Sequence, residues 1–145
     1  ASCLARGRRA RALPAPAVAR PSNCLKTVND LKGHGTGDQL LRRAADVLKR
    51  ALGSEQQIAR IGGDEFSALL PNHDVARMEE VARLIAAQLD VEESGQGATS
   101  LSLSIGVDVC KHPGELHAAL READRKMYEA KRSHYRKAGG AHHRN

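Results

Sequence analysis

The part of the chain richest in reactive side chains is residues 60–71, which read R-I-G-G-D-E-F-S-A-L-L-P. A Gly-Gly pair between two short extended segments is typical of a β-hairpin, because a tight type I′ turn needs positive φ at both central residues. Asp64 and Glu65 are then expected side by side and exposed at the hairpin tip. Two adjacent carboxylates are costly unless a positive group lies between or opposite them, and a divalent metal carrying phosphate is the first candidate.

The elements that must position this hairpin alternate along the chain. Residues 57–61 and 66–70 form its two arms, and helical periodicity predicts helices over 38–52, 75–89 and 114–132. A Gly-rich turn is expected at 94–98, followed by a strand at 99–109 with Ser102 and Ser104 on a solvent-facing side. Such alternation of strands and helices predicts a layered α/β sandwich.

Four blocks of the sequence resemble the GGDEF domain, the diguanylate cyclase module of bacteria. The first is the Gly-Gly-Asp-Glu-Phe run itself. Residues 25–40 resemble F-K-x-x-N-D-x-x-G-H-x-x-G-D-x-x-L, with Leu25 in place of the aromatic residue. Residues 104–107 look like the last core strand of the family, and residues 123–131 resemble its A-D-x-x-x-Y-x-A-K helix. The blocks follow the family order and cover residues 25–132.

The resemblance implies a fold and an activity. The fold is an α+β sandwich like the palm of nucleotidyl cyclases, with a mixed, mostly antiparallel sheet flanked by helices. The activity is that of a cytoplasmic enzyme that condenses two GTP into cyclic di-GMP and releases pyrophosphate. In each step a ribose 3′-hydroxyl attacks an α-phosphate, and two Mg²⁺ (or Mn²⁺) ions would supply charge neutralisation and alignment. A homodimer, with one GTP on each protomer, is needed for catalysis.

The signature loop carries the roles that the resemblance assigns to catalysis. Asp64 matches the metal ligand of the family, and Glu65 matches the carboxylate beside the attacking hydroxyl. Gly62 and Gly63 would let the backbone approach the phosphates. The alternative is an ordinary Gly-Gly hairpin with two solvated acids.

Four further residues match substrate-binding positions of the family. Asn29 and Asp38 match the pair that reads guanine, whose N1–H and N2–H a carboxylate can accept. Lys26 and Lys131 match phosphate contacts. Simpler roles stay open: Asn29 could shape a turn, Asp38 could cap a helix, and Lys131 could be a solvated charge near a helix end.

The sequence departs from the family just before this block. The family has D-x-D there, and its first Asp is a metal ligand, but this chain has Pro21, Ser22 and Asn23. Proline also argues against a central strand at that position. We therefore expect an atypical or disordered Ala/Arg/Pro-rich segment at 1–22, with the first helix and strand of the family missing or altered. A GGDEF domain at 23–133 and a basic tail at 134–145 follow.

These departures weaken the expectation of activity. A two-metal site that lacks one carboxylate loses much of its rate, so we expect the cyclase to be impaired. The alternative is a degenerate domain that binds GTP or a protein partner without catalysis. The product-inhibition motif R-x-x-D of the family is also absent, because its positions hold Gly53 and Gln56.

Charge and composition limit the classes of function that the chain can have. The net charge of +6 comes from the ends: residues 1–22 and 131–145 each hold five basic residues and no acid, so residues 23–130 carry −4. An acidic body with few aromatic residues does not favour nucleic-acid binding. No apolar run is long enough to span a membrane, and three cysteines without metal-ligand spacing suggest free thiols.

Overall fold

The structure is a computed structural model that describes residues 13–22, 25–53, 56–71, 74–95 and 99–140. Its strands and helices follow one another as β1 (Pro14–Pro21), α1 (Leu25–Lys32), α2 (His34–Leu52), β2 (Ile58–Arg60), β3 (Phe66–Pro71), α3 (Val75–Gly95), β4 (Leu103–Val107) and α4 (Leu116–Gly140). None of the described helices is long and apolar enough to cross a membrane.

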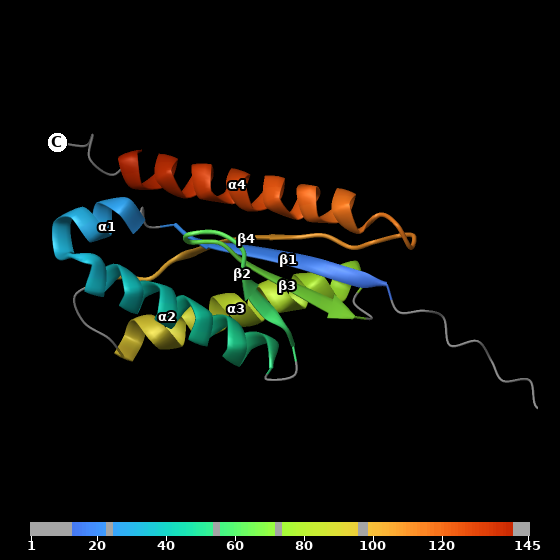
Figure 1. Cartoon of the computed structure of the whole chain (residues 1–145), viewed down its shortest axis with the longest axis horizontal. Coiled ribbons are helices and arrows are strands. Elements are labelled where there is room, and N and C mark those ends of the chain that lie inside the picture. The colour runs from blue at the N-terminus through green and yellow to red at the C-terminus, as the bar shows by residue number, and fades with distance from the viewer. Residues whose placement is uncertain (1–12, 23–24, 54–55, 72–73, 96–98, 141–145) are drawn as a thin grey trace, which may run out of the picture.

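The strands form one sheet in the order β2-β3-β1-β4, and all three pairings are antiparallel. Helices α2 and α3 cover one face of the sheet, and α4 runs across the other (Figure 1). This three-layer arrangement confirms the α+β sandwich that the sequence predicts.

Strand β1 corrects the expectation for the N-terminal segment. Residues 14–21, which the sequence suggested to be disordered or atypical, form a central strand between β3 and β4. The inference from Pro21 against a central strand is therefore wrong. Residues 1–12 and Asn23 lie outside the described residues.

The prolines fit a central strand because each lies where a ladder hydrogen bond is not needed. Ser22 N–H donates to the Ser102 carbonyl (2.8 Å), and the Pro16 carbonyl accepts from Asp108 N–H (3.1 Å), so even-numbered residues of β1 bond toward β4. Asp108 lies just past the end of β4, so Pro16 loses only a terminal bond. Odd-numbered Pro21 points its nitrogen toward β3, beyond that strand's first residue.

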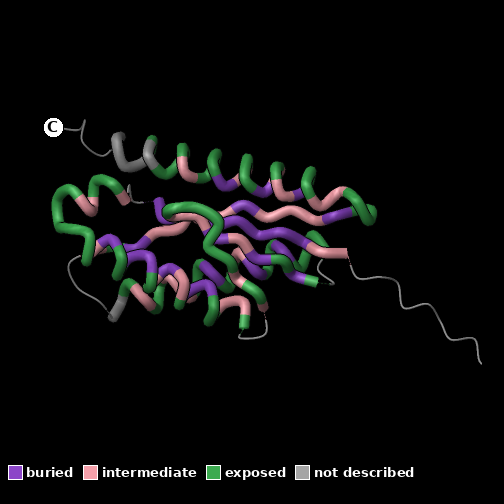
Figure 2. Tube along the Cα trace, in the orientation of Figure 1, coloured by how far each residue is buried: buried purple, intermediate pink, exposed green. Residues whose placement is uncertain are grey.

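Two hydrophobic layers hold the sheet between the helices. The larger core lies under α2 and α3, and Figure 2 shows buried residues along the strands and on the inner sides of the helices. Its main members are Ala15, Ala17, Leu40, Val47, Phe66, Leu70, Met78 and Ile85. On the opposite face, Val18 packs with Ala123 and Met127 of α4.

Strand β4 differs from its predicted pattern because α4 covers its second face. Ser104, expected on a wet face, is 3% exposed, and its Oγ lies 2.7 Å from Ser22 Oγ. Gly106 is also buried, and a Cβ there would collide with the Ala123 carbonyl. The described helices α2, α3 and α4 are also longer than predicted, and α1 was not predicted at all.

Candidate functional site

The signature residues form the tip of the β2–β3 hairpin, as the sequence predicts. Arg60 pairs with Phe66, and Ile61 N–H donates to the Glu65 carbonyl at 2.8 Å. This closes a three-residue tip, Gly62 to Asp64. The predicted type I′ turn is wrong, since the described glycines with positive φ do not include Gly62 or Gly63.

The side chain of Arg60 fixes the shape of this tip. Its Nε donates to the Gly62 carbonyl at 3.2 Å and its Nη2 donates to the Gly63 carbonyl at 2.6 Å. One guanidinium therefore satisfies two carbonyls of a short exposed loop. Sequence reasoning missed this role, because no local pattern shows that an arginine will fold back on the next three residues.

Asp64 faces a positive group from the central strand. Its Oδ1 lies 2.8 Å from Nε of Arg20, and the Asp64 side chain is only 14% exposed. The expectation that Asp64 and Glu65 are fully exposed is wrong, since both are partly buried. The positive partner that two adjacent carboxylates require is present, and among the described residues it is a guanidinium.

Glu65 points toward α4, where it meets Asp124. Partial burial raises the pKa of the Glu65 carboxyl, and a hydrogen bond with Asp124 and the charge of that residue raise it further. Arg20 opposes the rise, and neighbouring Asp64 adds to it. The tip therefore gathers three acids around one arginine, and like charges this close repel one another.

These residues do not fit the metal centre that the family implies. Pro21, at the position of the first metal carboxylate, is buried and has no donor atom in its side chain. Among the described residues no group of three or more His, Cys, Asp or Glu could hold a metal ion. Asp64, the predicted metal ligand, is already engaged by Arg20.

The proposed guanine pair lies at the junction of α1 and α2. Gly33 has φ 86° and its N–H donates to the Asn29 carbonyl at 2.9 Å, so it ends α1 and turns the chain into α2. The side chain of Asn29 then lies against Gly37, where any Cβ would collide with it. Asp38 follows directly and is exposed.

The carboxamide of Asn29 has an unused acceptor. Its Oδ1 is buried and receives no hydrogen bond from the described residues. A buried acceptor without a donor is costly, so a ligand that supplies an N–H would be favoured there. The side chain of Asn29 thus lies beside Gly37, the residue before Asp38, and the role of the two as a guanine-reading pair stays a prediction.

Asp38 also lines a pocket between α2 and the hairpin. The cavity has a volume of about 370 Å³, and its lining residues are Asp38, Leu41, Arg42, Ala45, Arg60 and Phe66. Two guanidinium groups and one carboxylate share its walls. Arg42 was not predicted as a site residue, and only its spacing of one helical turn from Asp38 could have suggested it.

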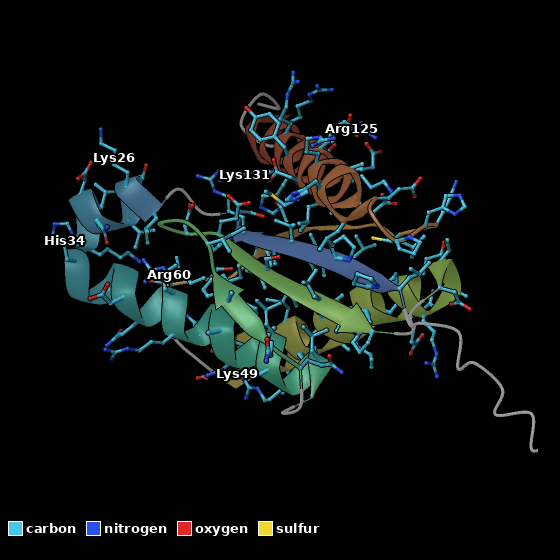
Figure 3. The ribbon with its side chains drawn as sticks, turned by 45° about the vertical axis from the view of Figure 1, so that its right-hand side comes forward. Lys26, His34, Lys49, Arg60, Arg125 and Lys131 are labelled. Carbon is cyan, nitrogen blue, oxygen red and sulfur yellow. The ribbon has the colours of Figure 1, made fainter. Side chains whose placement is uncertain are left out.

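The two candidate lysines lie on different helices. Figure 3 shows Lys26 on α1 and Lys131 on α4, with Arg60 below both and next to α2 in that view. Lys26 is exposed and Lys131 is partly buried. Their predicted phosphate contacts stay predictions.

Comparison with known proteins identifies the family. The family model "Diguanylate cyclase, GGDEF domain" matches residues 19–137. The cyclic di-GMP phosphodiesterase PdeR of Escherichia coli is 37% identical over 108 residues, which are 73% of this chain and 16% of that protein. Diguanylate cyclase TpbB of Pseudomonas aeruginosa is 36% identical over 115 residues, which are 77% of this chain and 26% of that protein.

Solved structures agree with this assignment. The GGDEF domain of PA1120 (TpbB or YfiN) from P. aeruginosa superposes with a TM-score of 0.71 at 32% identity, over 84% of this chain and 73% of that one. The GGDEF domain of DgcB from Caulobacter crescentus, in complex with c-di-GMP, gives 0.69 at 27% identity, over 84% and 74%. The chain belongs to the GGDEF domain family. It spans less than a third of the length of the first curated relatives that it matches, 16% to 31%.

Proposed function

We propose that this domain binds a guanine nucleotide, with GTP as the first candidate, and that its diguanylate cyclase activity is lost or strongly reduced. The observation that carries the binding proposal is the junction of α1 and α2. There the exposed Asp38 carboxylate follows Gly37, against which the side chain of Asn29 packs with a buried Oδ1 that receives no hydrogen bond from the described residues. An acceptor carboxylate matches the N1–H and N2–H of guanine and not the edge of adenine.

The surroundings of Asp38 favour an anionic nucleotide. Arg42 lines the same pocket, and a guanidinium binds phosphate oxygens with paired hydrogen bonds. Lys26 and Lys131 are further candidates for phosphate contacts.

The loss of catalysis is argued from the hairpin tip. Attack of a ribose hydroxyl on an α-phosphate needs concentrated positive charge at the phosphate. At this tip Asp64 is paired with Arg20 and position 21 is proline. The residues on both sides of the tip therefore lack the charge arrangement for the reaction.

A binding experiment tests the first part of the proposal. Titration calorimetry should detect GTP and no comparable binding of ATP, and Asp38→Asn should weaken GTP binding by about tenfold or more, because one charged hydrogen-bond acceptor is lost. Asp46→Asn is a matched control, since Asp46 is exposed on the same helix. Equal affinity for GTP and ATP, or no effect of Asp38→Asn, would exclude a guanine-reading role.

An active cyclase is the second candidate function. The intact Gly62 to Glu65 hairpin favours it, because the loop keeps the residue types of the family at the expected tip. In that case the domain would act as a homodimer and release pyrophosphate from two GTP. Formation of cyclic di-GMP from GTP and Mg²⁺ separates the two candidates.

A further inference from the structure

We propose that Arg20 is a built-in cation that replaces a divalent metal at the hairpin tip, so that this chain binds neither Mg²⁺ nor Mn²⁺ there. Two separate features then prevent this chain from forming the metal centre of the family. One is the missing carboxylate at Pro21, and the other is a guanidinium that holds Asp64. The inference does not rest on nucleotide binding, since its test uses the metal alone.

The strand register shows why position 21 is where a second ligand is missing. The β1–β3 pairing runs from Pro14↔Pro71 to Ala19↔Phe66. Pro21 lies beyond the paired residues, but it directly follows Arg20, whose side chain reaches Asp64 at 2.8 Å, so position 21 lies beside the hairpin tip. A carboxylate at position 21 could therefore share one ion with Asp64, whereas the proline ring cannot.

The missing carboxylate is only one of the two obstacles to metal binding, and the positive charge of Arg20 at the hairpin tip is the other. The Arg20 guanidinium contacts Asp64 at 2.8 Å, and the Arg20 side chain is 34% exposed while that of Asp64 is 14% exposed. An incoming divalent ion would have to displace this arginine and then remain near its positive charge. In a partly buried place screened little by solvent, both steps oppose metal binding.

Arg20 also stabilises the hairpin tip, because its positive charge offsets part of the negative charge of the neighbouring acids. Asp64, Glu65 and the nearby Asp124 form a concentration of acids, and the positive charge of Arg20 acts on Glu65 as well as on Asp64. A fixed cation lets the tip keep its fold without a bound ion. Restoring the carboxylate alone should therefore not restore a metal site.

The test titrates the natural chain, its Asp64→Asn variant and three further proteins with Mn²⁺, followed by electron paramagnetic resonance, which reports free Mn²⁺ directly. The further proteins are Pro21→Asp, Arg20→Gln with Pro21→Asp, and Arg83→Gln with Pro21→Asp. Arg83 is a matched control, because it is an exposed arginine of α3 paired with Glu80 and remote from the tip in sequence.

The expected result is that only the Arg20→Gln, Pro21→Asp protein gains a Mn²⁺ site. Its affinity should exceed that of Pro21→Asp and of the Arg83 control by about tenfold or more, as for other changes around a metal site. Three results would overturn the proposal: a Mn²⁺ site in the natural chain that Asp64→Asn removes, equal affinity for Pro21→Asp with and without Arg20, or no site in the folded double variant.

Folding of the variants is checked in the same series. An aspartate at the buried position 21 is expected to destabilise the protein, and Mn²⁺ should raise the melting temperature of the double variant alone. If the Arg20→Gln, Pro21→Asp protein does not unfold cooperatively, Mn²⁺ titration of the natural chain and of its Asp64→Asn variant still tests the proposal. A Mn²⁺ site that this change removes contradicts the proposal, and the absence of one supports it.

Discussion

The candidate site has two parts, the α1–α2 junction and the hairpin tip, and a few single residues make them different. At the α1–α2 junction Gly37 leaves space for the side chain of Asn29, and the residues match the family pattern. At the hairpin tip Asp64 is paired with Arg20, and the next residue, Pro21, has no donor atom in its side chain. In our proposal, base recognition and phosphate chemistry depend on separate residues, so one can persist without the other.

Gly37→Ala should weaken GTP binding without unfolding the protein. Its Cβ would overlap the carboxamide of Asn29, so Asn29 must leave its position beside Asp38. We expect a loss of affinity of about tenfold, the cost of one hydrogen bond to a buried polar group, measured by calorimetry. Gly35→Ala is the control, since a Cβ there meets nothing within 4 Å. The same affinity in both variants would contradict the placement of Asn29.

The sequence predicted most of these residues because they belong to local motifs. Asn29, Asp38 and Asp64 lie within contiguous blocks whose spacing is visible in the chain. Arg20 was missed as a partner of Asp64, because the two are 44 positions apart and meet only through the pairing of β1 with β3. A charge pair formed across a sheet leaves no local pattern.

Among the helices and strands, the contact between α2 and α3 includes a partly buried network of charges. Glu92 of α3 is 11% exposed and contacts Arg43 at 2.6 Å and Arg50 at 3.2 Å, both on α2. The hydrogen bond from Arg43, with a smaller contribution from Arg50, holds the pKa of Glu92 below its usual value. The ionised glutamate therefore stabilises the fold.

Glu92→Gln should lower the free energy of unfolding near neutral pH by about 1–2 kcal/mol. A carboxyl whose pKa is lowered on folding stabilises the protein above its unfolded pKa, and this contribution is lost as pH falls through the folded pKa. The difference between the two proteins in urea unfolding should therefore shrink at acidic pH. Exposed Glu79→Gln is the control, and a difference that grows at acidic pH would contradict the network.

The packing of α4 on the sheet depends on a glycine. A Cβ at Gly106 would collide with the Ala123 carbonyl and the Met127 nitrogen of α4. Gly106→Ala should therefore cost about 1–3 kcal/mol, the usual range for overpacking, measured by chemical unfolding beside Gly35→Ala. Unchanged stability would mean that α4 does not pack this closely.

Helix periodicity predicted three of the described helices, but the central strand was misjudged. A proline was expected to exclude a central strand, because the local rule considers only the missing N–H. A backbone N–H is needed only where a neighbouring strand offers a carbonyl, and this depends on where that strand ends. Likewise, the second face of β4 was predicted to be exposed to solvent, because a strand's own sequence does not reveal that the next helix, which begins at Leu116, will cover it.

At the scale of the whole molecule, the fold and family are those of a GGDEF domain. The sheet, the three covering helices and the hairpin are present, and at the tip of the hairpin Arg20 is paired with Asp64. A domain of this kind can retain a nucleotide pocket and its stability without the reaction. The central claim is therefore that binding persists and cyclisation does not.

The most direct test of this claim is product formation. The chain is incubated with GTP and Mg²⁺, and separately with GTP and Mn²⁺, and cyclic di-GMP is measured by chromatography beside an active diguanylate cyclase. Binding of GTP is confirmed by calorimetry on the same preparation. The account predicts bound GTP and no cyclic di-GMP above the protein-free background. Formation of cyclic di-GMP at a rate comparable to the active enzyme would contradict it.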